Sequence, residues 1–260
     1  MSMGRALLDK PPAASARWSL RLAAFGLLVA ALGVLLARAR AIDPASALVL
    51  LGLAGLFAVV ALLLAAAAAA SVWRDGRRGT GLAVAAVLLA LLQLAYPLYL
   101  AAQAVRLPAL ADATTDLADP PAFSRSARAL ALRGGQTPGE IAPAVRAAQR
   151  AAYPGVLPIV VELEGDEAYQ LALKTAAQMG WRISEQSPPG GRAGLGHIDA
   201  VDRTLLLGFA DDIAIRIRPL AGETRIDLRS ASRIGRHDFG ANARRIEAFV
   251  AQYQALLQNK

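Results

Sequence analysis

Long apolar runs fill the first hundred residues of the chain, whereas the rest alternates between apolar and polar positions over short distances. Three runs stand out, at residues 20–37, 45–72 and 81–104. Because a helix rises about 1.5 Å per residue and the hydrocarbon core of a bilayer is about 30 Å thick, about 20 apolar residues cross it. The pattern therefore predicts three transmembrane helices in an N-terminal region of residues 1–106.

The first run is the shortest, and it also fits the core of a signal peptide, with Arg17 and Arg21 at its charged end. Because Arg38 and Arg40 follow it and the second run begins at once, a retained helix is the preferred interpretation. No run has an ionisable residue near its centre. Since intramembrane charges mark transport and proton pathways, the runs favour an anchor over a transporter.

Basic residues near the ends of the runs predict the orientation, because cytoplasmic loops carry an excess of arginine and lysine. We expect a multi-pass protein of a bacterial inner (plasma) membrane, with its N-terminus in the cytoplasm and its C-terminal domain in the periplasm. Basic residues on the N-terminal side are Arg5, Lys10, Arg17, Arg21, Arg74, Arg77 and Arg78, and those on the other side are Arg38, Arg40 and Arg106, with Arg125 further away.

A proline-rich segment, residues 107–156, separates the runs from the C-terminal part. Its prolines at 108, 120, 121, 138, 143 and 154 disfavour helix and strand, which predicts a mostly extended linker on the surface. Residues 143–152 form the one helix we expect there. The stretch 123–132, FSRSARALAL, is expected to pack on the domain that follows.

Residues 157–260 predict an α+β domain with the order β-α-β-β-β-β-α, in which short turns imply an antiparallel sheet with helices on one face. Ile213, Ile215 and Ile217 alternate with polar or small residues, as in a strand with one buried face. If Ile217 pairs with Ile226 across the last hairpin, Arg216 lies opposite Asp227 and Arg218 opposite Arg225. We expect that second face to be solvated.

Charge and composition narrow the function classes. The net charge of +8 comes from residues 1–156, which hold 15 basic and 7 acidic residues, whereas residues 157–260 hold 13 of each. A neutral domain argues against nucleic-acid binding. The chain has no cysteine and only two histidines, His197 and His237, so thiolate sites are excluded, a histidine-rich metal site is disfavoured and no cofactor is expected.

Candidate chemistry gathers where the last strand turns into the last helix, in IDLRSASRIGRHDFGANARRIEAF (226–249). The favoured interpretation is structural. Asp238 caps the helix through the amide of Gly240 or Ala241, Gly235 takes a positive φ, and His237 is a solvated turn residue. The serines bond to the corner backbone, Asn242 to loop carbonyls, and Arg229 or Arg233 to Asp211 or Asp212. The candidate residues are Arg229, Ser230, Ser232, Arg233, Arg236, Asp238, Asn242, Arg245, Asp211 and Asp212.

Two other interpretations stay open. The helix N-terminus with Arg233, Arg236 and Ser232 has the groups of an anion site, although a capping Asp238 would occupy the place of the anion. His237, Asp238 and Ser232 are the residue types of a hydrolase, but no Gly-x-Ser-x-Gly motif is present. Asp211 and Asp212 point to opposite faces of a strand, which disfavours a catalytic pair. An enzyme is the least favoured class.

The chain resembles domain-of-unknown-function family 1499 over about residues 112–257. The resemblance rests on FADD with Phe209, on RSASRIG with Arg229 and Gly235, and on the helix start DFGAN followed by Arg245 and Ile246. TTDLADPPAF (114–123) resembles the opening segment of the family, and the three-helix region resembles one bacterial subgroup. The resemblance implies a fold and a membrane location and brings no activity with it.

Together these observations predict an inner-membrane protein with a non-catalytic periplasmic domain that binds a ligand or a partner at the cell envelope. The ligand classes are an anionic small molecule or a lipid headgroup, and the partner class is an envelope protein. An envelope hydrolase that uses the corner residues is the alternative.

Overall fold

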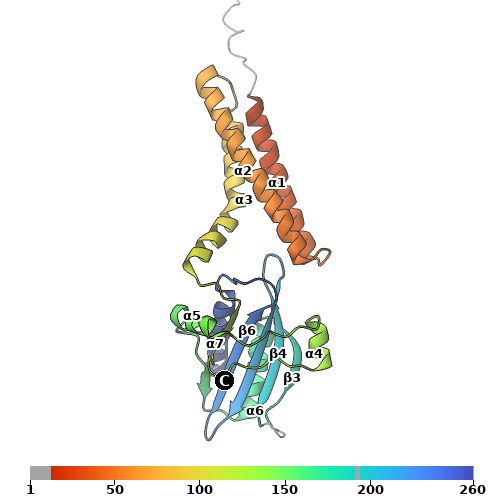
Figure 1. Cartoon of the computed structure of the whole chain (residues 1–260), viewed down its shortest axis with the longest axis vertical. Coiled ribbons are helices and arrows are strands. Elements are labelled where there is room, and N and C mark those ends of the chain that lie inside the picture. Colours follow the sequence, from red (N-terminus) through yellow and green to blue (C-terminus); the bar gives the residue numbers. More distant parts are fainter. Residues whose placement is uncertain (1–12, 191–193, 260) are drawn as a thin grey trace, which may run out of the picture. The chain divides into compact units, whose positions relative to one another are not determined.

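The computed structural model describes residues 13–190 and 194–259, which form two compact units (Figure 1). The first unit comprises the helical part of the chain up to Ala102 together with the short segment Leu205–Gly208, and the second comprises Gln103–Thr204 and the residues from Phe209 on. Arg5 and Lys10, on which part of the orientation argument rests, lie outside the described residues.

The first unit holds three helices, α1 (Ala14–Arg38), α2 (Pro44–Asp75) and α3 (Thr80–Arg106, whose last turn belongs to the second unit). All three are long and apolar enough to cross a membrane, which confirms the three apolar helices predicted from the sequence. Asp43 begins α2 by accepting a hydrogen bond from the Ser46 amide, and Gly76, in the left-handed conformation at φ 61°, ends it.

Small residues line the contacts between these helices. A Cβ added at Gly26 would lie 3.1 Å from the Cβ of Phe57, and one at Gly33 would lie 3.2 Å from that of Leu50. Glycine therefore sets the approach of α1 to α2, as is usual where membrane helices pack closely. Buried small residues along α2 are Ala47, Ala54, Ala58, Ala61, Ala65 and Ala68.

The second unit is a six-stranded antiparallel sheet in the order β1-β6-β5-β4-β3, with β2 also paired to β6. From residue 157 on, the predicted order β-α-β-β-β-β-α is confirmed. The strands are β1 (Asp112–Thr114), β2 (Ile159–Val161), β3 (Arg182–Ser187), β4 (Gly196–Arg203), β5 (Ala210–Pro219) and β6 (Thr224–Ser232), and the helices are α4 (Ala127–Leu132), α5 (Pro143–Ala152), α6 (Gly165–Gln178) and α7 (Ala241–Gln258).

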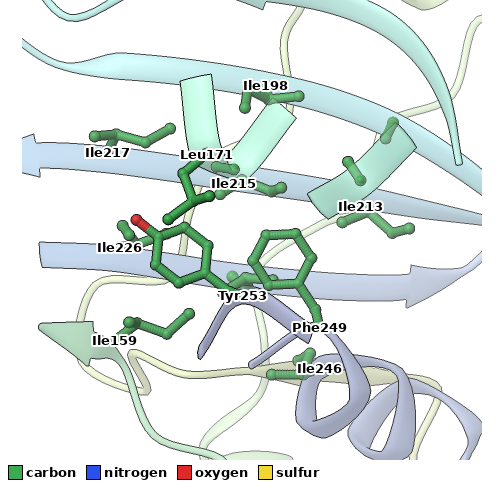
Figure 2. Packing of buried hydrophobic residues seen from close by; sticks show 14 of the residues in the cluster. Ile159, Leu171, Ile198, Ile213, Ile215, Ile217, Ile226, Ile246, Phe249 and Tyr253 are labelled. Atoms are coloured by element: carbon green, nitrogen blue, oxygen red, sulfur yellow. The ribbon is translucent and has the colours of Figure 1, made fainter. Parts of the chain in front are cut away.

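The register of the last hairpin is the predicted one, with Ile217 opposite Ile226 and Arg216 opposite Asp227. The alternating isoleucines of β5 consequently share one face, which α6 and α7 cover (Figure 2). Trp181 and Phe249 stack there with ring centroids 5.3 Å apart. Fully buried side chains of this core include Ile198, Ile213, Ile215, Ile217, Ile226, Leu228, Ile246, Phe249 and Tyr253.

The other face of the sheet is not solvated, and that expectation was wrong. Residues 112–133, which we call the strap, cross this face, and Phe123 is buried there against Ala214 and Ala231. The guanidinium groups of Arg133 and Arg229 lie 5.3 and 5.1 Å from the centre of the Phe123 ring. The stretch 123–132 thus packs on the domain as expected, and the segment 107–156 is less extended than expected, because it holds α4 as well as the predicted helix α5.

Gln149 of α5 closes the outer edge of β1. Its side-chain oxygen accepts a hydrogen bond from the Thr114 amide at 3.1 Å, and its nitrogen donates to the Thr114 carbonyl at 2.7 Å. The Gln149 side chain is buried. Both polar groups of that strand residue are thus satisfied by one amide side chain.

Candidate functional site

The corner between β6 and α7 is held by Asp238. Its Oδ1 accepts from the Gly240 amide at 2.8 Å and its Oδ2 from the Asn242 amide at 2.9 Å. The predicted contact with Gly240 is confirmed, and the second amide is that of Asn242 rather than Ala241. Gly235 takes the expected positive φ, at 98°. The amides of Gly240 and Asn242 at the start of α7 therefore already have a carboxylate partner, and the Ala241 amide between them donates to the Asp238 carbonyl.

Arg245 of α7 is the centre of a buried cluster on the helix-covered face. Its Nη2 lies 2.5 Å from Oδ2 of Asp211, and its Nε lies 2.7 Å from Oδ2 of Asp202. Those two carboxylates belong to paired residues on β4 and β5, so Arg245 offsets their mutual repulsion. Burial raises the pKa of Asp211, and the charge of Arg245 acts in the opposite direction.

The remaining polar groups of this cluster satisfy one another. Nη1 of Arg245 donates to Oγ of Ser230 at 3.0 Å and to Oδ1 of Asn242 at 2.8 Å. Ser230 donates to the same Oδ1 at 2.7 Å, and the Asn242 amide nitrogen donates to Oγ of Ser232 at 3.0 Å. The expectation that both serine hydroxyls would bond to the corner backbone was wrong, because their partners are side chains: Asn242 for both, and also Asp211 for Ser232.

The corner is also tied to the segment that follows α3. The Asp238 amide donates to the Leu110 carbonyl at 2.7 Å, and the Ser232 amide donates to the Ala111 carbonyl at 2.8 Å. The side chain of Asn242 donates to the same Ala111 carbonyl at 3.1 Å, so its predicted role at a loop carbonyl is confirmed. Three hydrogen bonds therefore join the corner to residues just before β1.

Arginines on the strap-covered face have carboxylate partners as well. Arg233 makes a two-pronged pair with Asp212, with nitrogen–oxygen distances of 3.0 and 2.7 Å. The predicted pairing is confirmed for this arginine, whereas Arg229 pairs with Asp112 at 2.7 Å instead. Burial raises the pKa of Asp112, and the hydrogen bond from Arg229 opposes that effect. Asp211 and Asp212 thus serve opposite faces of the sheet, as expected.

The residue types of a hydrolase are not assembled into a triad. Nδ1 of His237 accepts from the Phe239 amide at 2.9 Å, and the two rings stack 4.6 Å apart. His237 is half-buried rather than solvated, and its Nε2 has no hydrogen-bond partner within the part of the chain that the structure describes. Ser232 meets Asn242, and Asp238 meets the helix amides. Each group has a different partner.

Arg236 differs from the other corner arginines. Its side chain is exposed, and no residue in 13–190 or 194–259 makes an ion pair with it. Of the two arginines expected to bind an anion, Arg233 is therefore neutralised by Asp212, and Arg236 alone faces solvent with its charge uncompensated.

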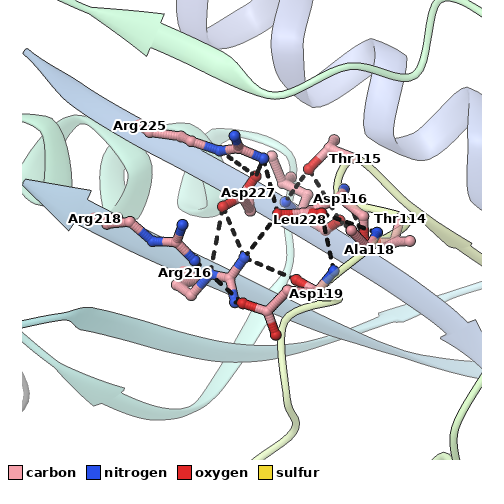
Figure 3. A network of polar contacts seen from close by, with 10 residues as sticks. All are labelled: Thr114, Thr115, Asp116, Ala118, Asp119, Arg216, Arg218, Arg225, Asp227 and Leu228. Atoms are coloured by element: carbon pink, nitrogen blue, oxygen red, sulfur yellow. Dashed lines mark hydrogen bonds and ion pairs between the residues drawn. The ribbon is translucent and has the colours of Figure 1, made fainter. Parts of the chain in front are cut away.

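A second polar network lies on the strap-covered face (Figure 3); its Arg216–Asp227 pair was predicted, whereas the acidic residues that the strap adds were not. Arg216 lies 2.9 Å from Oδ2 of the fully buried Asp227 and 2.8 Å from Asp119, and Arg225 lies 2.9 Å from Asp116. The pKa of Asp116 is lowered. Burial acts to raise it, but hydrogen bonds from backbone amides and the charges of Arg225 and Arg216 together outweigh that effect. Acidic residues in the strap, facing the alternate arginines of the hairpin, were the signal available in the sequence.

A third group of contacts joins the strap to β3 and β4. Buried Arg133 pairs with Asp199, and Asp199 also contacts Nε2 of His197 at 2.9 Å. Glu185 accepts hydrogen bonds from Ser126 at 2.5 Å and from Ser124 at 2.7 Å, and these bonds lower its pKa. Among the described residues, no group of three or more His, Asp or Glu side chains is placed to hold a metal ion.

Comparison with known proteins gives one family. The sequence model described as "Protein of unknown function (DUF1499)" matches residues 112–253, more than half of the chain. The match begins at the first residue of β1 and includes the strap, so the family pattern covers both faces of the sheet. No curated protein matched the chain.

Proposed function

The chain belongs to the DUF1499 family, and we propose that it holds its family domain at the periplasmic face of a bacterial inner membrane, where the domain binds a partner without catalysis. Three candidate membrane helices and a family domain of unknown function support a membrane protein. The periplasmic side, the bacterial inner membrane and the binding role of the domain are the parts that we propose.

The orientation rests on the distribution of basic residues around the helices. Arg74 lies in the last turn of α2 and Arg77 and Arg78 in the α2–α3 loop, whereas Arg38 ends α1 and Arg40 lies in the α1–α2 loop. Because loops with more arginine and lysine are the cytoplasmic ones, this distribution supports a periplasmic position for the end of α3.

Reporter fusions after Lys260 test the orientation. We expect alkaline phosphatase, which needs the periplasm to fold, to be active in this fusion, and a cytoplasm-dependent fluorescent protein to be dark. The matched control is the same pair of reporters fused in the α2–α3 loop after Gly76, where the outcome should reverse. A fluorescent Lys260 fusion with an inactive phosphatase would overturn the proposed side.

One observation carries the non-catalytic role: the ionisable groups at the β6–α7 corner are already engaged in ion pairs and hydrogen bonds with other groups of the domain. Asp211 pairs with Arg245, Asp212 with Arg233, and Asp238 with the amides of α7. Ser232, the proposed nucleophile of the alternative, accepts a hydrogen bond from Asn242, and the carboxylate beside it, that of Asp211, is held in an ion pair with Arg245. Such an arrangement fixes a surface rather than activating a nucleophile.

The same pairs guide the choice of ligand. With Arg233 held by Asp212 and the helix N-terminus taken by Asp238, an enclosed site for a small anion lacks its two main donors. The exposed Arg236 remains for a surface contact with an anionic partner, which is a lipid headgroup or an envelope protein in this proposal.

Hydrolysis assays on the full chain in nanodiscs test the non-catalytic role. With short-chain aryl esters as probes, we expect Ser232→Ala and His237→Ala to leave any hydrolysis at the level of the parent chain. Thermal unfolding of each variant provides the control for folding. Hydrolysis that is lost in both folded variants would favour the envelope hydrolase instead.

A further inference from the structure

A pocket at the edge of the sheet is lined by residues other than those of the β6–α7 corner. It has a volume of about 540 Å³ and lies between the strap, the end of α5 and the segment 154–158, which leads into β2. Arg225 of β6 also lines it. We call it the edge pocket. Its lining residues all belong to the second compact unit, and its volume is within the range of small-molecule sites in proteins.

Two arginines line the edge pocket, and one of them has no acidic partner. Arg150, in the last turn of α5, is exposed, and within residues 13–190 and 194–259 no carboxylate pairs with it. Arg225 instead belongs to the network in which three arginines meet three aspartates (Figure 3). The charges of that network cancel, so the pocket has a surplus of one positive charge, which is that of Arg150.

Arg225 keeps one nitrogen free for a further acceptor. Its Nε donates to Asp227 and its Nη2 to Asp116, both at 2.9 Å. Its Nη1 donates no hydrogen bond to any residue in the described part of the chain, and the side chain is 29% exposed. Because the two aspartates hold one edge of the guanidinium, an anion oxygen can bind Nη1 while both ion pairs remain.

The other lining residues are largely apolar. Leu157 is 61% exposed beside the buried Val156, and Leu117 of the strap is half-buried. Tyr153 offers its ring rather than its hydroxyl, because the hydroxyl oxygen is buried and a Cβ added at Gly240 would lie 3.0 Å from it. An apolar group in the pocket would remove this surface from water, which is favourable.

We propose that the edge pocket binds a small monocarboxylate with an apolar body, such as a fatty or aromatic acid. The carboxylate binds Arg150 and Nη1 of Arg225, and the apolar body covers Leu157 and the ring of Tyr153. Guanidinium groups form short, charge-assisted hydrogen bonds with carboxylates. The surplus of one positive charge matches a ligand with a single negative charge.

The site is partly organised before a ligand arrives. Asp227 is fully buried, and its ion pair with Arg225 fixes that guanidinium in the pocket wall. Binding therefore orders mainly the Arg150 side chain, which limits the loss of conformational freedom. The inference goes beyond the proposed function, because it assigns the domain a small-molecule site. It does not depend on the side of the membrane, on Arg236 or on the absence of catalysis.

Fluorine NMR tests the site, with para-fluorophenylbutyrate as the probe and the full chain in phosphatidylcholine nanodiscs. Binding broadens the fluorine signal, and empty nanodiscs provide the blank for partition of the probe into lipid. Arg150→Gln removes the surplus charge, and Leu157→Ser removes the exposed apolar contact. Arg128→Gln and Leu220→Ser are the matched controls, because these residues are also exposed but do not line the pocket. Thermal unfolding checks that all four variants are folded.

We expect Arg150→Gln to weaken binding of the probe about tenfold, because a charge-assisted hydrogen bond is lost. Leu157→Ser should weaken it several-fold, and both controls should keep the affinity of the parent chain. The neutral amide of the probe should bind about tenfold more weakly than the acid. Broadening no greater than in empty nanodiscs, equal affinity in folded Arg150→Gln, or equal binding of the acid and its amide would each overturn the proposal.

Competition distinguishes two sources of such an acid. Octanoate added to the solution should displace the probe if the pocket takes free acids from water. Oleate dissolved in the bilayer should displace it if the acid is drawn from the membrane, and phosphatidylglycerol at the same charge density is the control for repulsion of the probe by the surface. Displacement by neither acid beyond this control would contradict a monocarboxylate site.

Discussion

The two faces of one sheet are covered in different ways. On β5, Ile213, Ile215 and Ile217 face α6 and α7 in an apolar core, whereas Asp212 and Arg216 face the strap and pair with charged groups. Apolar burial is non-directional and tolerates imperfect geometry, so the first face mainly provides stability. Paired charges require their partners in place, because a buried charge without one is costly. The second face therefore determines where the strap lies more than how firmly the sheet folds.

The largest effect is expected from a substitution that disrupts the apolar core on the helix-covered face. Phe249→Ala removes a fully buried ring that stacks on Trp181, and it should lower the free energy of unfolding by about 4 kcal/mol. Urea unfolding of the full chain in nanodiscs measures this through the fluorescence of Trp181, after Trp18 and Trp73 are replaced by phenylalanine. The loss should be the same at neutral and mildly acid pH. Leu205→Ala, at an exposed position, is the control and should change stability by less than about 0.5 kcal/mol.

An intermediate effect is expected at Arg245. Arg245→Met leaves Asp202 and Asp211 opposite each other without the guanidinium between them, which should cost about 3 kcal/mol at neutral pH. Because burial raises the pKa of Asp211, the folded state binds a proton at this carboxyl more readily than the unfolded state does, and losing the charge of Arg245 strengthens that preference. Part of the loss should thus be recovered as the pH falls, unlike the loss in Phe249→Ala.

The exposed Arg244 is the matched control for Arg245. Arg244→Met, at the adjacent position on α7, should stay within about 0.5 kcal/mol of the parent chain. An Arg245→Met loss that is as large in acid as at neutral pH would mean that packing of the side chain, and not its charge, matters at this position.

The smallest expected effect concerns Asp116 in the strap. The pKa of Asp116 is lowered from 3.8 in the folded chain. The folded state therefore binds the proton less readily, and the stabilisation is complete above pH 3.8 and lost as the pH falls through the folded value. Asp116→Asn should flatten the acid branch of the unfolding curve. Glu185→Gln, whose parent pKa is lowered from 4.5, should do the same independently, and unchanged acid branches in both would contradict the assigned contacts.

The parts of the fold that follow from local periodicity were predictable from the sequence. In β5 only one register buries Ile213, Ile215 and Ile217 together, because a shift by one residue would turn them to the other face. β1 was not predictable, since Asp112–Thr114 is short and polar and becomes a strand only by pairing with β6, far along the chain. The covered second face was missed for the same reason: its cover comes from a segment whose prolines indicate a loop.

The candidate site shows the same division. The contact of Asp238 with Gly240 depends on a spacing of two residues, and Arg233 meets Asp212 across adjacent strands, so both were within reach of sequence reasoning. The position of Arg245 over Asp202 and Asp211 depends on how α7 lies on the sheet, which no local pattern determines. Side-chain partners of Ser230 and Ser232 were missed for that reason.

The side-chain amide of Gln149 bonds to both the backbone amide and the backbone carbonyl of Thr114. This contact matters when many copies of the protein share one membrane. Copies of a membrane-anchored protein meet repeatedly in two dimensions, and an open strand edge on each domain would invite them to pair into larger sheets. A side chain from α5 blocks the outer edge of β1 at Thr114, its last residue, so another chain cannot add a strand there without displacing it. One glutamine thereby removes from this edge the free backbone groups of Thr114 that a neighbouring chain would need for pairing.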